Sequence, residues 1–387
     1  MKICFLSSAH PALDKRVFDK EARALSEAGH TVYHLCPQSA NEPLGKWEQA
    51  GITIQTYSRL DGLSGRVRQF LRLYRLAKAV DADAYHCNEV DSWAIGVLLR
   101  LTTGRKCLVD IHEHYPSTFA ETRFPRWLQP AAASAVRCCY MLLAPFTTSI
   151  VLAKQSVASD FWFAKSKIVL VQNFARLSAL RPTQESASPI SSKAEAPTLV
   201  HLGLLSRARG WPQLLDAIKL LKNDEVRLHI IGEFHDGTED AFFTQAKELG
   251  VQHRIVFDQW MPFDDAFRCL LKAHVGLILF QPGIQNHVFA LPHKMFDYML
   301  AELPFIAPSF AEEVQEIVKN SGAGLLVDPT RPEEIAEAVD RILQDPVLSQ
   351  TLGTRGREAV LETYNWEAEA AKLLRTYEEL LLVPTAT

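Results

Sequence analysis

The sequence lacks the features that mark several classes of protein. Its seven cysteines are odd in number and include no CxxC pair, which argues against a zinc ribbon and a disulfide framework. Its 41 basic and 45 acidic residues leave a net charge of only −4, so we expect no nucleic-acid partner. We interpret the cysteines as reduced thiols, mostly in the core, of a cytoplasmic protein.

No stretch of the sequence is apolar for long enough to cross a bilayer. The longest apolar run, from Cys138 to Ala153, contains Pro145 and falls short of the roughly 20 residues that a spanning helix needs. We interpret it as a buried helix, a turn and a buried strand. We interpret residues 1–11 as containing a first buried strand and expect them to be too short for a signal peptide. The sequence predicts a protein in the cytoplasm, at most bound to the cytoplasmic face of the membrane.

What the sequence does contain is a regular alternation of apolar strands, such as Ile3–Ser7 and Thr198–Gly203, and amphipathic helices, such as Asp14–Ala28. Its 387 residues suit two domains, and the alternation predicts an α/β fold of two doubly wound, Rossmann-like domains facing a central cleft. A polar, proline-bounded stretch indicates a linker between them. We expect an N-terminal domain at 1–180, the linker at 181–197, a C-terminal domain at 198–365, and a helix at 366–387 that crosses back to the N-terminal domain.

Candidate site residues of the first half follow its strands, because ligands of such sheets bind beyond the carboxyl ends of the strands. The first turn, "SSAHPALDKR", lacks GxGxxG, which removes the main support for a nicotinamide dinucleotide. Two interpretations stay open for this turn: a helix cap through Asp14, or contact with an acceptor. The residues that we place on the acceptor side of the cleft are His10, Asp14, Arg16, Asn88 and Glu113.

The segment "CLVDIHEHYP" gives the sharpest signal of the first half. An apolar strand ends there in Asp110, His112, Glu113 and His114, and polar residues clustered at such an end rarely serve packing. The spacing of the two histidines would suit a metal, but no third ligand is evident, so we expect no metal. We favour a catalytic His112 that contacts a sugar or handles a proton over a purely structural histidine.

Basic residues follow the first strand of the second half, in "HLGLLSRARG". Gly203 permits a tight turn, and Arg207 and Arg209 come before the next helix. A strand, a glycine turn and basic residues suit a diphosphate, although arginines are also common in surface loops.

The segment "ALPHKMFDYM" predicts a second part of the same site. Pro292 suits the first position of a helix, whose N-terminal N–H groups attract anions, and Lys294 would bind the diphosphate there. Asp297 could accept hydrogen bonds from two ribose hydroxyls, or pair with Lys294 on a solvated face. The preceding loop can offer further contacts to a donor sugar, which we assign to His287, Phe289, Ala290 and Leu291.

Together these stretches resemble the retaining glycosyltransferases of the GT-B fold, family 4 (group 1), over nearly the whole chain. "VDIHEHYP" is similar to the family's strand end, whose histidine lies near the donor sugar, which implies that role for His112. "HLGLLSRARG" is similar to its diphosphate motif and maps the basic residue onto Arg209. "LPHKMFDYMLAELP" is similar to the sub-pattern whose acid binds the ribose, which implies that role for Asp297.

The sequence departs from the family pattern at four positions. Phe289 stands where the first acid of the family's pair would be, which leaves the donor sugar in doubt. Asp297 replaces the usual glutamate, and Leu204 replaces an arginine. Glu302 stands where the family has glycine, which would cost roughly 1 kcal/mol if that position needs a positive φ.

The resemblance implies transfer of a sugar, with retention, from a nucleotide diphosphate sugar to a hydroxyl of a glycan or lipid-linked glycan. UDP- and GDP-sugars are the expected donors, bacterial surface polysaccharide such as lipopolysaccharide the expected product, and no cofactor or metal is expected. A basic helix at 64–80 could dock on anionic lipid of the inner membrane, or be a solvated face. The alternatives are a nucleotide-sugar 2-epimerase of the same architecture and a non-catalytic scaffold.

Overall fold

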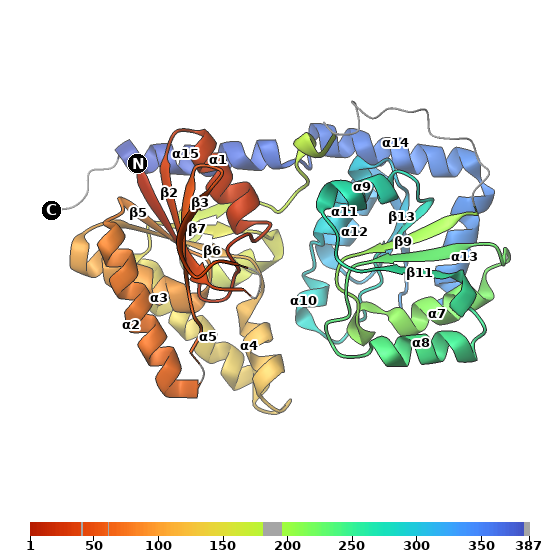
Figure 1. The fold of residues 1–387 in the computed structure, drawn as a ribbon, viewed down its shortest axis with the longest axis horizontal. Coiled ribbons are helices and arrows are strands. Elements are labelled where there is room, and N and C mark those ends of the chain that lie inside the picture. Colours follow the sequence, from red (N-terminus) through yellow and green to blue (C-terminus); the bar gives the residue numbers. More distant parts are fainter. Residues whose placement is uncertain (40–41, 61, 181–195, 383–387) are drawn as a thin grey trace. The chain divides into compact units, whose positions relative to one another are not determined.

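The computed structural model of the protein describes residues 1–39, 42–60, 62–180 and 196–382. These residues form two compact units, and each is built around its own sheet (Figure 1). The first unit comprises Met1–Asn173 and the C-terminal helix α15 (Trp366–Leu382), and the second comprises Phe174–Asn365. The predicted fold class, two parallel-sheet α/β domains, is confirmed.

The first unit contains an eight-stranded sheet in the order β3-β4-β2-β1-β5-β6-β7-β8. All neighbouring pairs are parallel except β3 with β4, which forms an antiparallel edge. The strands are β1 (Lys2–Leu6), β2 (Thr31–Pro37), β3 (Gly45–Gln49), β4 (Ile52–Tyr57), β5 (Ala84–Cys87), β6 (Lys106–Ile111), β7 (Ser149–Leu152) and β8 (Ile168–Leu170). The helices are the π-helical turn η1 (Val17–Ala22), α1 (Arg23–Glu27), α2 (Gly62–Val80), α3 (Val90–Thr103), α4 (Tyr115–Arg123) and α5 (Gln129–Leu143), with short 3₁₀ turns after them.

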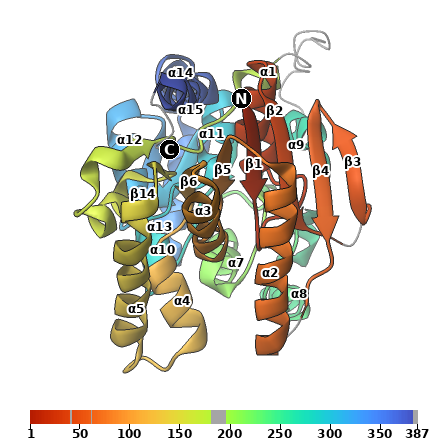
Figure 2. The same ribbon diagram turned by 90° about the vertical axis from the view of Figure 1, so that its left-hand side faces the viewer.

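Helices cover both faces of this sheet, which explains why its strands are apolar without alternation. Ile3 and Phe5 of β1 pack against η1, α1 and α15, whereas Cys4 and Leu6 pack on the opposite face with α2, α3 and α5. Both coverings are visible in Figures 1 and 2. The helix α15 thus completes the core of the first unit.

The second unit contains a six-stranded parallel sheet in the order β11-β10-β9-β12-β13-β14. Its strands are β9 (Thr198–Leu202), β10 (Arg227–Ile231), β11 (Ile255–Asp258), β12 (Val275–Leu277), β13 (Phe305–Pro308) and β14 (Gly324–Val327). One face packs against α7 (Trp211–Leu220), α8 (Glu239–Glu248) and α13 (Pro332–Gln344). The other packs against α9 (Phe263–Leu270), α11 (His293–Leu300), α12 (Glu312–Ser321) and α14 (Pro346–Glu362), and a short helix α10 (Gln285–Val288) precedes α11.

Each sheet reverses its strand order at one point, between β1 and β5 in the first unit and between β9 and β12 in the second. Ligands of doubly wound sheets bind beyond the carboxyl ends of the strands at such a switch point. The loops after these four strands are therefore where each unit can hold chemistry.

The boundary between the units differs slightly from the expected one. Residues 174–180 belong to the second unit, because Phe174 packs edge-on against Phe296 and Tyr364, and Ala175 pairs with Asn365. The predicted linker at 181–197 lies almost wholly outside the described residues.

The prediction that the helix in the long apolar run is buried was wrong. In α5 only Ala132 and Tyr140 are buried, Leu142 is 70% exposed, and Cys138 and Cys139 are exposed rather than core thiols. The helix is apolar around its circumference but packs into the core of the first unit through one narrow face only. Within the part of the chain that the structure describes, no helix is both long and apolar enough to span a bilayer.

Candidate functional site

The loop that follows β1 is held by one buried carboxylate of the neighbouring switch-point strand. Glu89, which follows β5 and caps α3, accepts hydrogen bonds from the backbone N–H groups of Ser8, Ala9 and His10 at 2.8, 3.0 and 3.2 Å. A carboxylate that accepts three backbone N–H groups fixes the loop strongly. The side chain of His10 is thereby placed at the carboxyl edge of the sheet.

Arg16 is a buried supporting residue, which corrects its assignment to the acceptor side. Its guanidinium donates two hydrogen bonds to Asp110 at 2.8 and 2.9 Å, one to the carbonyl of Val171, and pairs with Glu21 at 2.9 Å. Buried partners engage all three of its guanidinium nitrogens, and the residue is 4% exposed, so its donors serve the protein rather than an acceptor. It instead anchors Asp110 at the end of β6, because a fork of donors suits a carboxylate.

A chain of hydrogen bonds links Asp110 to the exposed edge. Asp110 contacts Nε2 of His112, whose Nδ1 lies 3.1 Å from Nε2 of His10. Nδ1 of His10 lies 3.1 Å from Asp14, which also accepts the backbone N–H groups of Arg16 and Val17. The structure therefore brings together three residues that the sequence placed near the site separately: His10, Asp14 and His112.

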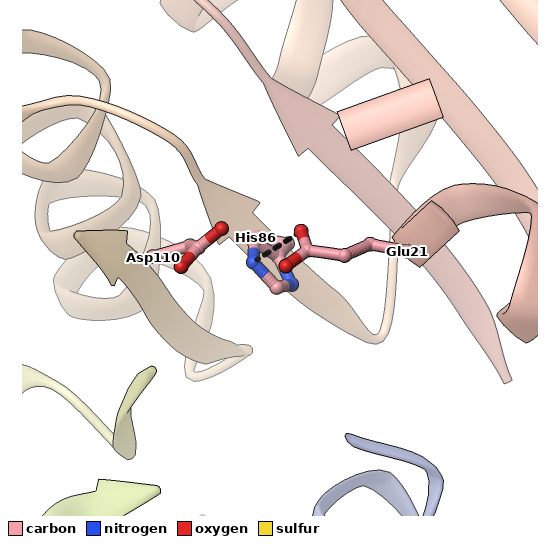
Figure 3. Close-up of side chains that lie close together, drawn as sticks. All are labelled: Glu21, His86 and Asp110. Atoms are coloured by element: carbon pink, nitrogen blue, oxygen red, sulfur yellow. Dashed lines mark ion pairs between the residues drawn. The ribbon is translucent and has the colours of Figure 1, made fainter. Parts of the chain in front are cut away.

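A second group lies deeper beneath this chain. His86 of β5 lies between Asp110 and Glu21 (Figure 3). Its Nδ1 forms a 2.8 Å hydrogen bond with the hydroxyl of Tyr377 on α15. One atom from each of Glu21, His86 and Asp110 lies within 4.8 Å of the others, a spacing that could suit a metal. The guanidinium of Arg16 already bridges both carboxylates, however, so a cation would meet a positive charge there.

Burial sets the charge of this deeper group. Burial raises the pKa of Glu21 well above its usual range, against the pull of Arg16. Burial also lowers the pKa of His86 to about 4. Asp110 behaves oppositely: burial would raise its pKa, but Arg16 and His112 outweigh that and hold it well below the usual range. The single guanidinium is thus balanced by an ionised Asp110, with Glu21 and His86 neutral.

The remaining acceptor-side residues of the first unit differ in access. Asn88 is fully buried and donates to the hydroxyl of Ser7 at 2.7 Å, so it supports the loop after β1 rather than facing solvent. Glu113 is exposed. His114 is buried, caps α4 and pairs with Asp160 at 2.9 Å, so it does not join His112 in a metal site.

In the second unit, two glycine turns meet at the carboxyl ends of β9 and β10. Gly203 and Gly232 both have positive φ, and a Cβ on Gly232 would lie 2.2 Å from the carbonyl oxygen of Gly203. Only glycine allows the two turns to approach so closely. Because neither turn carries a side chain at this point, their backbone atoms line the sheet edge where a ligand would lie.

The two predicted arginines follow these turns. Arg209 is half-buried, with its guanidinium 5.4 Å from the centre of the Phe280 ring, close to the end of β12. Arg207 is exposed and stacks on Trp211 at 4.7 Å. The structure thus places Arg209 at the switch point, and Arg207 further out.

The helix α11 brings a buried lysine to the same place. Lys294 lies in the first turn, is 8% exposed, and its Nζ is 3.2 Å from Nε2 of His201 on β9. Burial, and then the charge of Arg209, hold the pKa of Lys294 well below its usual range. Burial and Lys294 likewise lower the pKa of His201. The charge of Lys294 is thus held near that of Arg209 at an energetic cost, which an anion would relieve.

Asp297 lies one turn after the start of α11. It is 2% exposed, and its carboxylate is 2.9 Å from Nδ1 of His293. Asp297 and Lys294 are both buried, which removes the alternative of a pair on a solvated face. Pro292 is the N-cap rather than the first helical residue, a shift of one position.

The four residues of the loop before α11 that were predicted to contact a donor sugar differ in burial and contacts. Ala290 and Leu291 are buried in the core, and Phe289 ends the short helix α10. His287 stacks on Phe280 and holds the carbonyl oxygen of Gln281 at 2.8 Å. Glu302, at the position where the family has glycine, does have a positive φ of 55°.

Sequence reasoning missed four residues of these groups: Glu21, His86, His201 and Tyr377. Each is a polar residue inside an otherwise apolar strand or helix face, which is an unusual place for one. That signal could have marked them as residues with buried partners. It could not have named the partners, which lie on other elements.

Two family profiles match the chain in succession. Residues 15–177 match the family described as "Glycosyltransferase Family 4", and residues 183–359 match "Glycosyl transferases group 1". Together the two matches take in most of both units.

Individual curated relatives are more distant. An uncharacterized glycosyltransferase of Methanocaldococcus jannaschii is 27% identical over 185 residues, 46% of this chain and 44% of that protein. The lipopolysaccharide core biosynthesis glycosyltransferase LpsE of Rhizobium meliloti is 24% identical over 205 residues, 53% of this chain and 56% of LpsE. A GDP-mannose-dependent phosphatidylinositol monomannoside mannosyltransferase of Mycobacterium tuberculosis is 27% identical over 187 residues, 46% of each chain. The chain thus spans about half the length of the curated relatives it matches.

Solved structures match over nearly the full length. Sucrose-phosphate synthase from Thermosynechococcus elongatus superposes with a TM-score of 0.74 at 17% identity, over 98% of this chain and 99% of that one. Anabaena HepE in complex with UDP superposes with a TM-score of 0.74 at 15% identity, over 98% of this chain and 100% of HepE. At such identity the likeness shows the fold, and with the two family profiles it leads to one conclusion: the chain belongs to the group 1, family 4 glycosyltransferases, with the GT-B fold.

Proposed function

We propose that the protein is a retaining glycosyltransferase that moves a sugar from a UDP- or GDP-sugar to a hydroxyl of a glycan or lipid-linked glycan. The observation that carries the proposal is the buried Lys294 at the start of α11, gathered with His201 and Arg209 at the switch point of the second sheet. A nucleoside diphosphate is the anion that such a site of a nucleotide-binding fold suits.

Different residues of the second unit would bind different parts of the donor. Lys294, Arg209 and the first N–H groups of α11 would neutralise the diphosphate as it leaves, so the proposal needs no metal. Arg207 would add a peripheral charge. Asp297, one turn further along α11, would accept hydrogen bonds from the ribose hydroxyls, and His293 orients its carboxylate.

The donor class is supported by what related proteins bind. HepE was solved with UDP and with UDP-glucose, and the Mycobacterium tuberculosis relative is named as dependent on GDP-mannose. LpsE is named for lipopolysaccharide core biosynthesis, which supports a surface-polysaccharide product for this chain. His112 of the first unit is proposed to contact the donor sugar, with His10, Asp14 and Glu113 on the acceptor side.

A lipid-linked acceptor would bring the protein to the cytoplasmic face of the membrane. The five basic residues of α2 are all exposed, and Val67 and Leu71 are exposed between them, at 56% and 46%. A helix with basic and apolar residues on its outer surface suits an anionic lipid surface. The basic residues are Arg66, Arg68, Arg72, Arg75 and Lys78.

The donor part of the proposal is tested by thermal shift with UDP, GDP, ADP, dTDP and CMP at millimolar concentration. A ligand at 100 times its Kd stabilises the folded protein by about 2.7 kcal/mol, which is easily detected. We expect UDP or GDP to raise the Tm of the wild type and to have a much smaller effect on Asp297→Asn. If no nucleotide raises the Tm, the enzyme is not of this class.

Transfer is then separated from other uses of a nucleotide sugar by adding the acceptor. UDP-glucose and GDP-mannose are incubated with and without an acceptor glycan, and the sugar is followed by mass spectrometry. Consumption that depends on the acceptor supports transfer. A changed sugar that stays on the nucleotide without an acceptor would instead show an epimerase.

A further inference from the structure

The two aspartates at the ends of the hydrogen-bonded chain in the first unit fix its proton count. Asp14 accepts backbone N–H groups of Arg16 and Val17 at 2.8 and 2.9 Å, and Asp110 accepts two hydrogen bonds from Arg16. Both carboxylates are therefore held ionised and can act only as acceptors. It follows that His10 donates its Nδ1–H to Asp14, and His112 donates its Nε2–H to Asp110.

One nitrogen of each ring then remains, and the two face each other. Nε2 of His10 lies 3.1 Å from Nδ1 of His112, with the ring centres 4.7 Å apart. With no further proton, two lone pairs would oppose each other at that distance. With two further protons, two N–H groups would point at each other. Only one additional proton makes a hydrogen bond between the rings.

We propose that His10 and His112 share one proton, and that His10 is a positioning residue that fixes the ring and tautomer of His112. The pair carries one positive charge between two carboxylates. It works as a unit, because moving the proton or the ring of one histidine changes what the other can donate.

The surroundings favour the charge on His10. Burial would lower the pKa of His10, but its hydrogen bond to Asp14 and the charges of Glu89, Asp14 and Asp110 outweigh that and raise it above the usual range. The titratable and charged groups that face the pair come from the loop after β1 and from β2, β5, α3, β6 and the start of η1. They are Asp14, Arg16, His34, His86, Glu89 and Asp110.

The arrangement has a consequence for the role of His112 in transfer, which rests on the proposed function. Both ring nitrogens of His112 are engaged, so the ring can bind a sugar hydroxyl only by giving up one partner. Asp110 is fully buried, whereas the side chain of His10 is 24% exposed. The bond to His10 is therefore the one that a substrate would replace, and the proton would stay on His10.

The proposal is tested by following the imidazole ¹⁵N signals of the wild type between about pH 4.5 and 9. We expect the pair to take up its first proton well above, and its second well below, the ordinary histidine value of about 6.5, with both rings responding to both steps. Two independent single titrations near 6.5 would overturn the proposal. Signals of His229 and His253, in the second unit, serve as an internal reference.

Two variants sharpen the assignment. In His10→Gln the amide can still donate one hydrogen bond to Nδ1 of His112 but cannot titrate, so the signals of His112 should show one step in place of two. In Asp14→Asn the side-chain oxygen can still cap η1, but the charge that holds the proton is lost, so the upper step should fall by about one pH unit or more. If the upper step is the same in both variants as in the wild type, the shared proton is refuted. The wild-type titration decides the matter alone if a variant does not fold.

The pH profile of transfer then connects the pair to activity. The rate of the wild type should fall on the alkaline side at the pH of the upper step, whereas His10→Gln should lose that limb. An alkaline limb retained at the same pH in His10→Gln would refute the positioning role. The NMR result does not depend on donor binding, so failure of this inference and failure of the proposed function can be told apart.

Discussion

The two units place polar side chains at the same part of the same kind of sheet, but they treat charge in opposite ways. At the sheet edge of the first unit, two cationic groups lie beside ionised carboxylates: Arg16 beside Asp110, and His10 beside Asp14. In the second unit two cationic groups lie near each other, because Lys294, which contacts the neutral His201, is held in the field of Arg209. Charges matched within the protein hold a structure in place. Like charges gathered near one another store repulsion that an anionic ligand can release.

The largest expected effect comes from breaking the matched charges of the first unit. Arg16→Met would leave Asp110 buried and ionised without its partner, so we expect the free energy of unfolding to fall by roughly 3–5 kcal/mol in urea denaturation. The matched control is Arg268→Met, which removes an exposed pair with Asp265 on α9 and should cost no more than about 1 kcal/mol. Equal costs would mean that the buried network does not support the first unit.

Acid should weaken the first unit through its buried neutral histidines. Burial lowers the pKa of both His34 and His86 to about 4, so below pH 6.5 the unfolded chain binds protons that the folded one does not. Stability should therefore fall as the pH drops from 6.5 toward 4, by on the order of 2 kcal/mol for each histidine by pH 5. Urea denaturation at pH 7 and pH 5 measures this fall. His86→Gln should reduce it and the exposed His253→Gln should not; an unchanged fall in His86→Gln would contradict the account.

The glycine turns of the second unit should tolerate no side chain. In Gly232→Ala the new Cβ would overlap the carbonyl oxygen of Gly203, so we expect a loss of roughly 1–3 kcal/mol of stability together with weaker donor binding. Gly237→Ala is the control, because its φ is also positive but no atom lies within 4 Å of the new Cβ. It should cost about 1 kcal/mol by thermal denaturation and leave binding unchanged. Similar losses in both variants would show that backbone strain alone, and not the close approach of the turns, is responsible.

The smallest effect is expected at Glu302, which has a positive φ of 55°. Glu302→Gly removes that strain but also an exposed ion pair with Arg357 at 3.1 Å, so we expect a gain of no more than about 1 kcal/mol in thermal denaturation. Glu302→Gln keeps the strain and loses only the ion pair, and should be slightly destabilised. If Glu302→Gly is the less stable of the two, the strain is not relieved by glycine.

The architecture could be predicted from the sequence because strands that are buried on both faces of a sheet appear in it as continuous apolar runs. Strands such as Ile3–Ser7 and Thr198–Gly203 were predicted within one residue of β1 and β9, since apolar runs bounded by turns indicate buried strands. The edge strand β3 went unpredicted because its surface is largely exposed and its residues are polar. The helix expected at Asp14–Ala28 begins three residues later, with a π-helical turn that periodicity does not reveal.

The candidate site was only partly predictable, because the partners of its residues lie on elements that are distant in the sequence. The sequence indicated His10, His112 and Arg209 because they follow strands, and Lys294 and Asp297 because they follow the proline before α11. The partners that set their charge have no such position: His201 lies within the apolar strand β9, His86 within β5, and Tyr377 291 residues after His86. Such partners are joined only by folding. The access of Arg16 was mispredicted for the same reason, because its burial depends on Asp110 and Glu21.

The central claim is that the gathered positive charge of the second unit binds the donor diphosphate. Isothermal titration of UDP and GDP into the wild type, Lys294→Met and the exposed-lysine control Lys219→Met tests it most directly. Methionine suits the buried position, so Lys294→Met should fold at least as stably, and any loss of affinity then reports the missing charge. We predict that Lys294→Met weakens binding by roughly 10-fold or more, the loss of one charge-assisted hydrogen bond, while Lys219→Met binds as the wild type does. Equal affinity in Lys294→Met and wild type would contradict the account.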